Sequence, residues 1–363
     1  MRHVPGIDVW RGLSVLLVIT HHVAIRLPLK ATPLGDHLPA RLLLAISWNG
    51  YEAVLIFFVI SGFLITARTL DRDGRPADID LRAFWTRRLA RIAPPLLLLV
   101  GVLCVLHALG VPDYTIDPER QTLGLAVLSA LTFWLNVYEG RTGYLPGSWD
   151  VLWSLSIEEL FYLGFPLLFR LSRREAVVAA LLVPFAALLP LWHWMAEGEI
   201  WRDKATLPGM AAIATGVVAA MAARRLPASP RRDRVLVALG SALVVSVLGW
   251  GDLWWARIGE GTLLVHVVGV ALALAGAYGR RAEQPWRWTE PVRSFGRLSY
   301  EIYLTHMFVV FTLVRLWTAV GWGRPEGALV TPLAVVGAWG LGWAFARGWS
   351  EPANAWVRAR LTS

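Results

Sequence analysis

Charge is scarce in this chain of 363 residues. Only 17% of the residues are charged, whereas 56% are hydrophobic and the mean hydropathy is +0.51. A soluble globular protein carries roughly a quarter charged residues. The composition therefore excludes an ordinary soluble enzyme, a coiled coil and intrinsic disorder, and it favours a membrane protein with many spans.

Cysteine and lysine are almost absent. The single cysteine, Cys104, excludes disulfides within the chain and cysteine-based metal sites. Lysine occurs only at Lys30 and Lys204, so nearly all the basic charge is arginine, and the net charge is +9. These arginines lie between apolar stretches, which favours cytoplasmic loops over a nucleic-acid partner.

Several motifs of well-known sites are also missing. The sequence has no Gly-rich phosphate loop, no dinucleotide fingerprint, no helical His-Glu-x-x-His zinc pair and no Gly-x-Ser-x-Gly elbow. We therefore expect no metal site and no permanently bound cofactor.

What the chain does contain is a series of eleven apolar blocks of about the length that spans a bilayer. They cover residues 7–25, 46–66, 92–110, 121–137, 153–169, 176–192, 206–223, 235–250, 262–279, 299–319 and 330–349. Basic stretches lie at residues 68–91, 170–174, 224–234, 280–297 and 347–360. If all five are cytoplasmic, an even number of crossings must separate each pair, yet three blocks lie between Arg91 and Arg170.

The block at 121–137 is the one we predict not to cross, because it contains Thr132 and Asn136 and runs into a Gly- and Pro-rich loop. We expect it to be re-entrant, or interfacial at the outer face, and to line a site. The predicted fold is an all-α polytopic membrane protein of about ten transmembrane helices plus this segment. Residues 1–363 would form a single domain of the inner, cytoplasmic membrane, with both termini in the cytoplasm and an unknown oligomeric state.

Ionisable residues inside the first block suggest a functional site, because charge at membrane depth is costly. Arg11 and His22 are eleven residues apart, close to three helical turns or roughly 16 Å, so they share a face. His21 points about 80° away. Asp8 lies one turn before Arg11 and can pair with it. The alternative is that Arg11 extends to the inner surface while His22 lies idle near the outer one.

Two later blocks carry polar stripes. Ser154, Glu158 and Tyr162 follow at i, i+4 and i+8, while Glu159 points toward Leu155 and Ser156. One of the two carboxylates could instead cap or pair with a neighbouring span.

In the tenth block, Tyr303 and His306 are i, i+3 neighbours, for which interhelical hydrogen bonding is the alternative role. Arg87, Arg88 and Arg91 precede the third block, and a guanidinium group binds phosphate through two parallel hydrogen bonds.

These runs, taken in order, resemble the acyltransferase-3 family of integral membrane acyltransferases. The matching runs are Ile7 to Gly12 with His22 at the family's Arg-x10-His spacing, Phe57 to Thr66, Arg87 to Pro94, Trp153 to Tyr162, and Ser299 to His306. Many members carry an additional esterase-like domain, and we expect a stand-alone membrane domain here.

The resemblance implies transfer of an acyl group, usually acetyl, from cytoplasmic acyl-CoA to a hydroxyl group. The acceptor would be a carbohydrate, a glycolipid or a small metabolite at the outer side. His22, Glu158 and Arg11 are the candidate catalytic residues, with His22 as base or acyl carrier and Glu158 orienting it.

Arg88, Arg91 and Arg87 would bind the donor, and Asp8, Ser154, Glu159, Tyr162, Tyr303 and His306 would support the site. The alternative function is a transporter or flippase for a lipid-linked or anionic substrate, with the same polar residues as its pathway.

Overall fold

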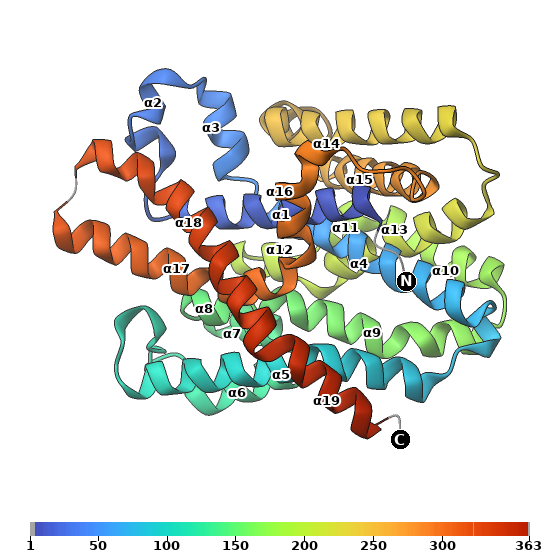
Figure 1. The fold of residues 1–363 in the computed structure, drawn as a ribbon, viewed down its shortest axis with the longest axis horizontal. Helices are drawn as coiled ribbons and strands as arrows, with labels where there is room; N and C mark the ends of the chain where they lie inside the picture. The colour runs from blue at the N-terminus through green and yellow to red at the C-terminus, as the bar shows by residue number, and fades with distance from the viewer. Residues whose placement is uncertain (1–3, 322, 362–363) are drawn as a thin grey trace.

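The computed structural model describes residues 4–321 and 323–361, and all its regular elements are helical (Figure 1). Within these residues, nine helical segments are long and apolar enough to cross a bilayer. They are built on α1 (Pro5–Ala24), α4 (Gly50–Asp73), α5 (Leu81–Ala108), α9 (Trp153–Ser172), α13 (Thr206–Arg225), α14 (Pro230–Ile258), α15 (Gly261–Gly279), α17 (Ser299–Val320) and α18 (Arg324–Phe345). The all-α polytopic fold is confirmed.

Shorter helices connect the long ones. They are α2 (Leu34–His37), α3 (Ala40–Ser47), α6 (Leu123–Leu131), α7 (Leu135–Thr142), α8 (Gly147–Asp150), α10 (Glu175–Ala187), α11 (Leu189–Trp194), α12 (Glu199–Lys204), α16 (Glu290–Arg297) and α19 (Glu351–Leu361). Single 3₁₀ turns lie at Leu29–Ala31, Pro76–Asp78, Pro112–Tyr114 and Arg287–Thr289, and a π-helix at Ala346–Ser350 joins α18 to α19.

The basic stretches of the sequence gather at one end of the bundle, called here the basic end. Arg224 pairs with Asp71, and Arg225 lies 3.0 Å from Glu175. Arg170 donates to the carbonyl of Ile79 at 3.0 Å. The described N- and C-terminal residues lie toward this end as well (Figure 1). These basic stretches lie at one end of the bundle, as the crossings inferred from loop charge require. That this end faces the cytoplasm stays a prediction.

The block at 121–137 does not cross, as predicted. It folds as α6 and α7, which are separated by a turn at Thr132 to Trp134. Gln121, before α6, donates to Thr142 Oγ1 at 3.0 Å and to the carbonyl of Gly143 at 2.7 Å, after α7. The segment therefore enters and returns to the level at which it began, which is a re-entrant arrangement.

The block at 176–192 differs from the single span that we expected. It forms α10 and α11, which are separated at Leu188. Pro190 lies in the first turn of α11, and a proline removes a helical hydrogen bond and clashes with the preceding turn. Both helices pack along α13, from Glu175 at the basic end to His193 beside Glu260 at the opposite end. In the described residues neither helix is long enough to cross a bilayer alone, so the count of ten crossings stays a prediction.

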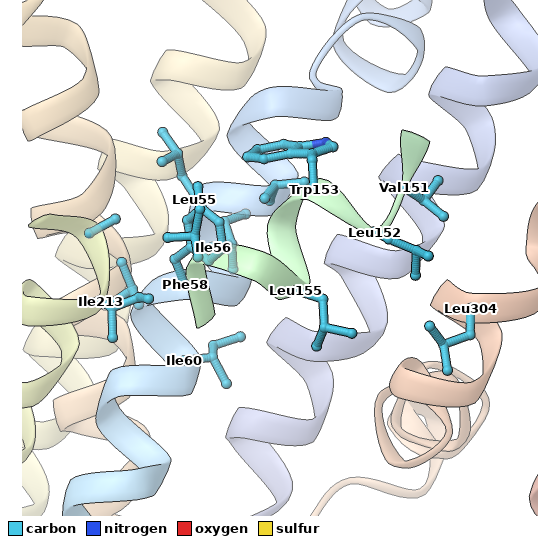
Figure 2. Packing of buried hydrophobic residues seen from close by; sticks show 14 of the residues in the cluster. Leu55, Ile56, Phe58, Ile60, Val151, Leu152, Trp153, Leu155, Ile213 and Leu304 are labelled. Carbon is cyan, nitrogen blue, oxygen red and sulfur yellow. The ribbon is translucent and has the colours of Figure 1, made fainter. Parts of the chain in front are cut away.

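Close helix contacts form the centre of the bundle. Gly62 of α4 lies against the carbonyl of Ile213, and Gly216 of α13 lies against that of Val59, so a Cβ atom at either glycine would be about 2 Å from an oxygen. Small residues of this kind allow transmembrane helices to pack backbone to backbone. Beside this crossing lies an apolar cluster from α4, α9, α13 and α17, in which the ring centroids of Trp153 and Phe58 are 6.1 Å apart (Figure 2).

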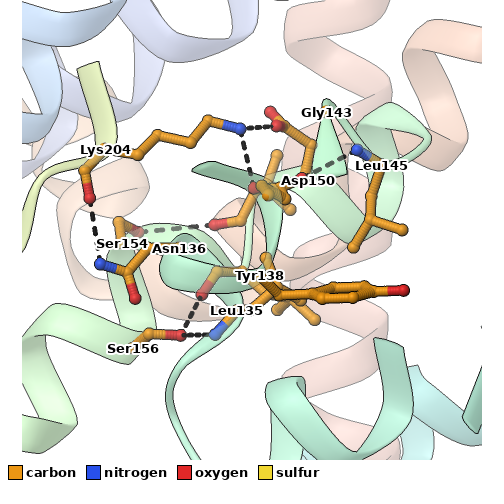
Figure 3. A network of polar contacts seen from close by, with 12 residues as sticks. Leu135, Asn136, Tyr138, Gly143, Leu145, Asp150, Ser154, Ser156 and Lys204 are labelled. Carbon is orange, nitrogen blue, oxygen red and sulfur yellow. Dashed lines mark hydrogen bonds and ion pairs between the residues drawn. The ribbon is translucent and has the colours of Figure 1, made fainter. Parts of the chain in front are cut away.

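A buried ionic network fixes the re-entrant segment (Figure 3). The ammonium group of Lys204 lies 2.8 Å from Glu139 Oε2 and also pairs with Asp150. Glu139 Oε1 accepts from the backbone of Leu145 at 3.0 Å, and Asn136 donates to the carbonyl of Lys204 at 3.0 Å. The network joins α7, α8 and α12 and so determines where α9 begins.

Candidate active site

A cavity of about 820 Å³ opens at the basic end and extends deep into the bundle. Its lining on α4 runs from Val54 to Arg72, eighteen residues further on, or about 27 Å of helix at 1.5 Å per residue. Eight arginines line it, and we call it the arginine cavity: Arg11, Arg68, Arg72, Arg87, Arg88, Arg91, Arg297 and Arg358. Of these, Arg72 and Arg358 are exposed and Arg11 is buried, so positive charge extends from the mouth to the interior.

Arg11 is held at the junction of three helices. α16 crosses α1 where Gly12 lies against the carbonyl of Val292 and Gly296 lies against that of Asp8. This crossing brings Ser299 to Arg11, whose Nη2 donates to Ser299 Oγ at 2.8 Å. Arg11 Nη1 lies 3.8 Å from Asp8 Oδ1, so the predicted pair with Asp8 is confirmed.

The three predicted donor-binding arginines all lie in the arginine cavity. α5 begins at Asp80, whose carboxylate caps the backbone of Ala83 at 3.0 Å, and it presents Arg87, Arg88 and Arg91 to the cavity. The guanidinium of Arg88 lies over the ring of Tyr162, 3.4 Å from its centroid. Arg87 Nη2 and Arg88 Nε are buried and have no hydrogen-bond partner. Unpaired buried donors of this kind are suited to an anionic ligand.

Glu158 accepts hydrogen bonds within the cavity wall. Ser61 Oγ of α4 donates to it at 3.3 Å and Tyr162 OH at 3.4 Å, and the two hydroxyls also contact each other. The predicted stripe of Ser154, Glu158 and Tyr162 lines the cavity. Glu159 lines it too, together with Leu155, toward which it was predicted to point, so the cavity reaches a second face of α9.

Ser154 and Tyr303 mark the deep limit of the cavity. Tyr303 OH donates to the carbonyl of Val151 at 3.0 Å, and Ser154 Oγ lies 2.8 Å from the same hydroxyl. The ring of Phe57 packs edge-on against Tyr303, at 6.1 Å between centroids. These contacts form a narrow layer between α4, α9 and α17, which we call the tyrosine layer.

His22 and His306 lie together beyond the tyrosine layer, with ring centroids 4.9 Å apart. His306 Nδ1 is 2.8 Å from the carbonyl of Tyr303, and His22 Nδ1 is 2.8 Å from the carbonyl of Val18. A carbonyl only accepts, so both Nδ1 atoms carry protons. The lone pair of His306 Nε2 then faces His22 Nδ1 at 3.3 Å, and His22 Nε2 keeps its own lone pair.

The predicted pairing of Glu158 with His22 is not formed. Among the described residues, Glu158 contacts Ser61 and Tyr162, whereas His22 contacts Val18 and His306. The two catalytic candidates lie on opposite sides of the tyrosine layer, because α9 begins one helical turn before Glu158 and the layer closes over that first turn. His22 also does not line the arginine cavity, although Arg11 on the same helix does.

His21 has a different environment from its neighbour. Its Nδ1 donates to the carbonyl of Ser47 at 2.9 Å, and its ring packs edge-on against Trp48. The ring also fills the space beside Gly50 at the start of α4. These contacts are those of a packing residue.

Four arginines and a serine of the cavity were not singled out from the sequence. Arg68, Arg72, Arg297 and Arg358 belong to basic stretches whose charge was attributed to membrane orientation, and Ser61 lies in a run used only as a family motif. Spacing could have indicated Arg68, which follows Ser61 by seven residues on one helix. Nothing in the sequence brings Arg358 to Arg87. No cluster of three or more potential metal ligands occurs in the described part of the chain.

One known protein family matches nearly the whole chain. The family described as an acyltransferase domain matches residues 4–346. The chain belongs to this acyltransferase family. The match includes every helix that lines the arginine cavity except α19.

Several curated proteins resemble this acyltransferase. The O-acetyltransferase OatA of Staphylococcus aureus is 34% identical over 170 residues, which are 46% of this chain and 24% of that protein. The putative peptidoglycan O-acetyltransferase YrhL of Bacillus subtilis is 26% identical over 85% of this chain and 49% of its own length. The peptidoglycan O-acetyltransferase OatA of Listeria monocytogenes is 24% identical over 88% and 52%.

The chain therefore spans at most about half the length of these relatives. No solved structure matches it.

Proposed function

We propose that this protein transfers an acetyl group from acetyl-CoA, bound from the cytoplasm, to a hydroxyl group of a carbohydrate at the outer side of the membrane. The arginine cavity is the observation that carries the proposal. A donor with phosphates at one end and a thioester at the other fits a cavity whose cationic mouth leads to a neutral layer beside two histidines. The two relatives that span most of this chain are named for peptidoglycan O-acetylation, which favours a sugar hydroxyl of a cell-wall glycan as acceptor.

In the proposed reaction, His22 Nε2 is the general base. Its lone pair is available because the ring's other nitrogen keeps its proton for Val18. The acceptor oxygen attacks the thioester carbonyl carbon as His22 takes the hydroxyl proton. The C–S bond then breaks, the sulfur leaves with the electron pair, and it takes the proton from His22 to give the free thiol of CoA.

A relay through His22 uses the same atoms in two steps. His22 Nε2 attacks the thioester carbonyl carbon and the thiolate leaves, giving a cationic acyl-imidazolium. The acceptor hydroxyl then attacks its carbonyl carbon, the C–N bond breaks to restore neutral His22, and the hydroxyl proton passes to the thiolate. In either route His22 becomes positively charged. The Val18 carbonyl and the lone pair of His306 face its Nδ1–H and stabilise that charge.

Arg11 and Glu158 act on the donor side in this proposal. Arg11, anchored by Ser299, contributes positive charge midway along the cavity. Glu158 accepts hydrogen bonds from the Ser61 and Tyr162 hydroxyls, and the guanidinium group of Arg88 packs on the ring of Tyr162. Both therefore position groups that contact the donor.

The transporter alternative is not favoured, because the family and the named relatives are transferases. The test is to incubate the purified protein with acetyl-CoA labelled in the acetyl group and with peptidoglycan fragments, glycolipids or small alcohols. We expect release of free CoA and an acetyl ester on the glycan. Binding of acetyl-CoA without release of CoA for any acceptor would contradict the proposal.

A further inference from the structure

The mouth of the arginine cavity includes a helix that lies outside the region matched by the family. The match ends at residue 346, and α19 begins at Glu351. Arg358 of α19 lines the cavity together with Arg87 of α5 and Arg72 of α4. The charges of Arg72 and Arg358 act on Arg87, as do those of Asp73 and Asp80, which places the three arginines in one group beside two carboxylates. We call this group the mouth cluster.

α19 is held in place by its junction with α18. In the π-helix Ala346–Ser350, Trp349 Nε1 donates to the carbonyl of Pro94 at 2.9 Å, and Ser350 Oγ donates to Glu301 Oε1 at 2.8 Å. Pro94 belongs to α5 and Glu301 to α17, and both helices line the cavity. α19 then packs along α5. These contacts hold α19 against α5 and its junction against α17, and they therefore place Arg358 at the mouth of the cavity.

Seven of the eight arginines divide by depth into two groups, and the eighth, Arg297, pairs with Glu290. Arg11, Arg68, Arg88 and Arg91 lie further in, and the charges of Arg68 and Arg91 act on Arg11. In the mouth cluster, Arg72 is held by Asp73 in a two-pronged ion pair at 2.5 and 2.6 Å. Arg87 keeps a buried Nη2 without a hydrogen-bond partner. Arg87 thus has a donor left for a ligand, and Arg358 lines the mouth together with it.

We propose that Arg358, with Arg87, binds the 3′-phosphate of the donor's ribose and makes the enzyme selective for CoA over 3′-dephospho-CoA. This inference rests on the proposed function. A donor that enters thiol first places its diphosphate deeper than its ribose, so the deep arginines meet the diphosphate and the mouth cluster meets the 3′-phosphate. A phosphomonoester carries about −1.5 to −2 charges near neutral pH and presents three acceptor oxygens. Two guanidinium groups match that charge and geometry.

The experiment compares Arg358→Gln with Arg360→Gln in the full-length protein. Arg360 lies on the same helix, over the ring of Trp356 at 4.1 Å, and does not line the cavity. Binding of CoA and of 3′-dephospho-CoA is measured by titration, and KM is measured with the acetylated form of each. We expect the wild-type protein and Arg360→Gln each to bind CoA at least ~10-fold more tightly than 3′-dephospho-CoA, as the strength of charge-assisted hydrogen bonds implies.

In Arg358→Gln, affinity for CoA should fall by about that factor while affinity for 3′-dephospho-CoA stays unchanged, so that the preference disappears. Arg87→Gln should reduce the preference in the same direction. Equal losses for both ligands, or an unchanged preference, would overturn this inference and leave the proposed donor intact. If the wild-type protein binds neither ligand, the proposed function fails and this inference fails with it.

Discussion

The carbonyl of Val18 determines which nitrogen of His22 can react. It lies one helical turn before His22 and is free to accept a second hydrogen bond from the Nδ1–H. The imidazole is thereby kept in the tautomer whose Nε2 is basic, without a carboxylate partner. A histidine on a helix can obtain this orientation from its own backbone.

Replacing His22 with Ala should lower turnover by about 10²–10⁴-fold, the usual contribution of a general base. His21→Ala should retain most of the activity, because His21 packs on α3 and α4. Turnover is measured as CoA release from acetyl-CoA, and donor binding is measured separately to confirm that both variants are folded. An inactive His21 variant beside an active His22 variant would contradict the assignment.

Replacing Arg88 with Gln should raise the KM for acetyl-CoA by about 10- to 100-fold and change kcat little. The substitution removes a charge-assisted contact of ~1.5–3 kcal/mol to a phosphate. The matched control is Arg82→Gln on the same helix, an exposed residue that does not line the cavity. An equal change of KM in the two variants would indicate that Arg88 packs against Tyr162 and does not bind the donor.

Helical spacing predicted much of the donor side of the site. Asp8 pairs with Arg11, the stripe at Ser154, Glu158 and Tyr162 faces one cavity, and the arginines of α5 join it. Spacing along one helix cannot show what a neighbouring helix contributes. The tyrosine layer, which separates Glu158 from His22, and the contact of His22 with His306 depend on how α17 packs, and α17 is nearly 300 residues away in sequence.

At the scale of elements, the re-entrant segment makes a prediction about accessibility. Glu119→Cys and Arg141→Cys lie before and after it, and both residues are exposed. In a protein whose Cys104 has been replaced by Ala, both should react with an impermeant thiol reagent from the same side of the membrane. Arg174→Cys, at the basic end, should react only from the other side. Labelling of residues 119 and 141 from opposite sides would show that the block crosses.

The ionic network around Lys204 should stabilise the same segment. Lys204→Met leaves the buried Glu139 without its cation, and breaking a buried pair costs ~3–5 kcal/mol. We expect a lower melting temperature in detergent and, because α9 begins beside this network, lower activity. The control is Lys30→Met, which changes the chain's other lysine, an exposed residue, and should leave the melting temperature unchanged.

Loop charge and hydropathy predicted most elements but not the break in the block at 176–192. Hydropathy averages over a window and is insensitive to single prolines, whereas Pro190 decides where the helix ends. The same averaging concealed the buried Lys204. Its burial depends on carboxylates that lie more than 50 residues away in sequence.

For the whole molecule, the gathering of basic stretches at one end predicts one-sided use of the donor. Acetyl-CoA does not cross bilayers, so vesicles that expose the basic end should release CoA and vesicles of the opposite orientation should not. The orientation of each preparation is established with the Arg174→Cys label. Equal activity in both preparations, without leakage, would contradict donor entry at the basic end.

The tyrosine layer has an electrical consequence. A channel lined by eight arginines and open at both ends would conduct chloride and discharge the membrane potential. The Ser154–Tyr303 contact and the apolar packing around Trp153 close the deep end of the cavity. In the proposed general-base reaction, an acetyl group would cross this layer outward while the hydroxyl proton returned to the sulfur, so that no net charge would move through it. With a cytoplasmic donor and an outer acceptor, as proposed, the energy of the thioester would drive chemistry at the cell surface while the ion gradients stay intact.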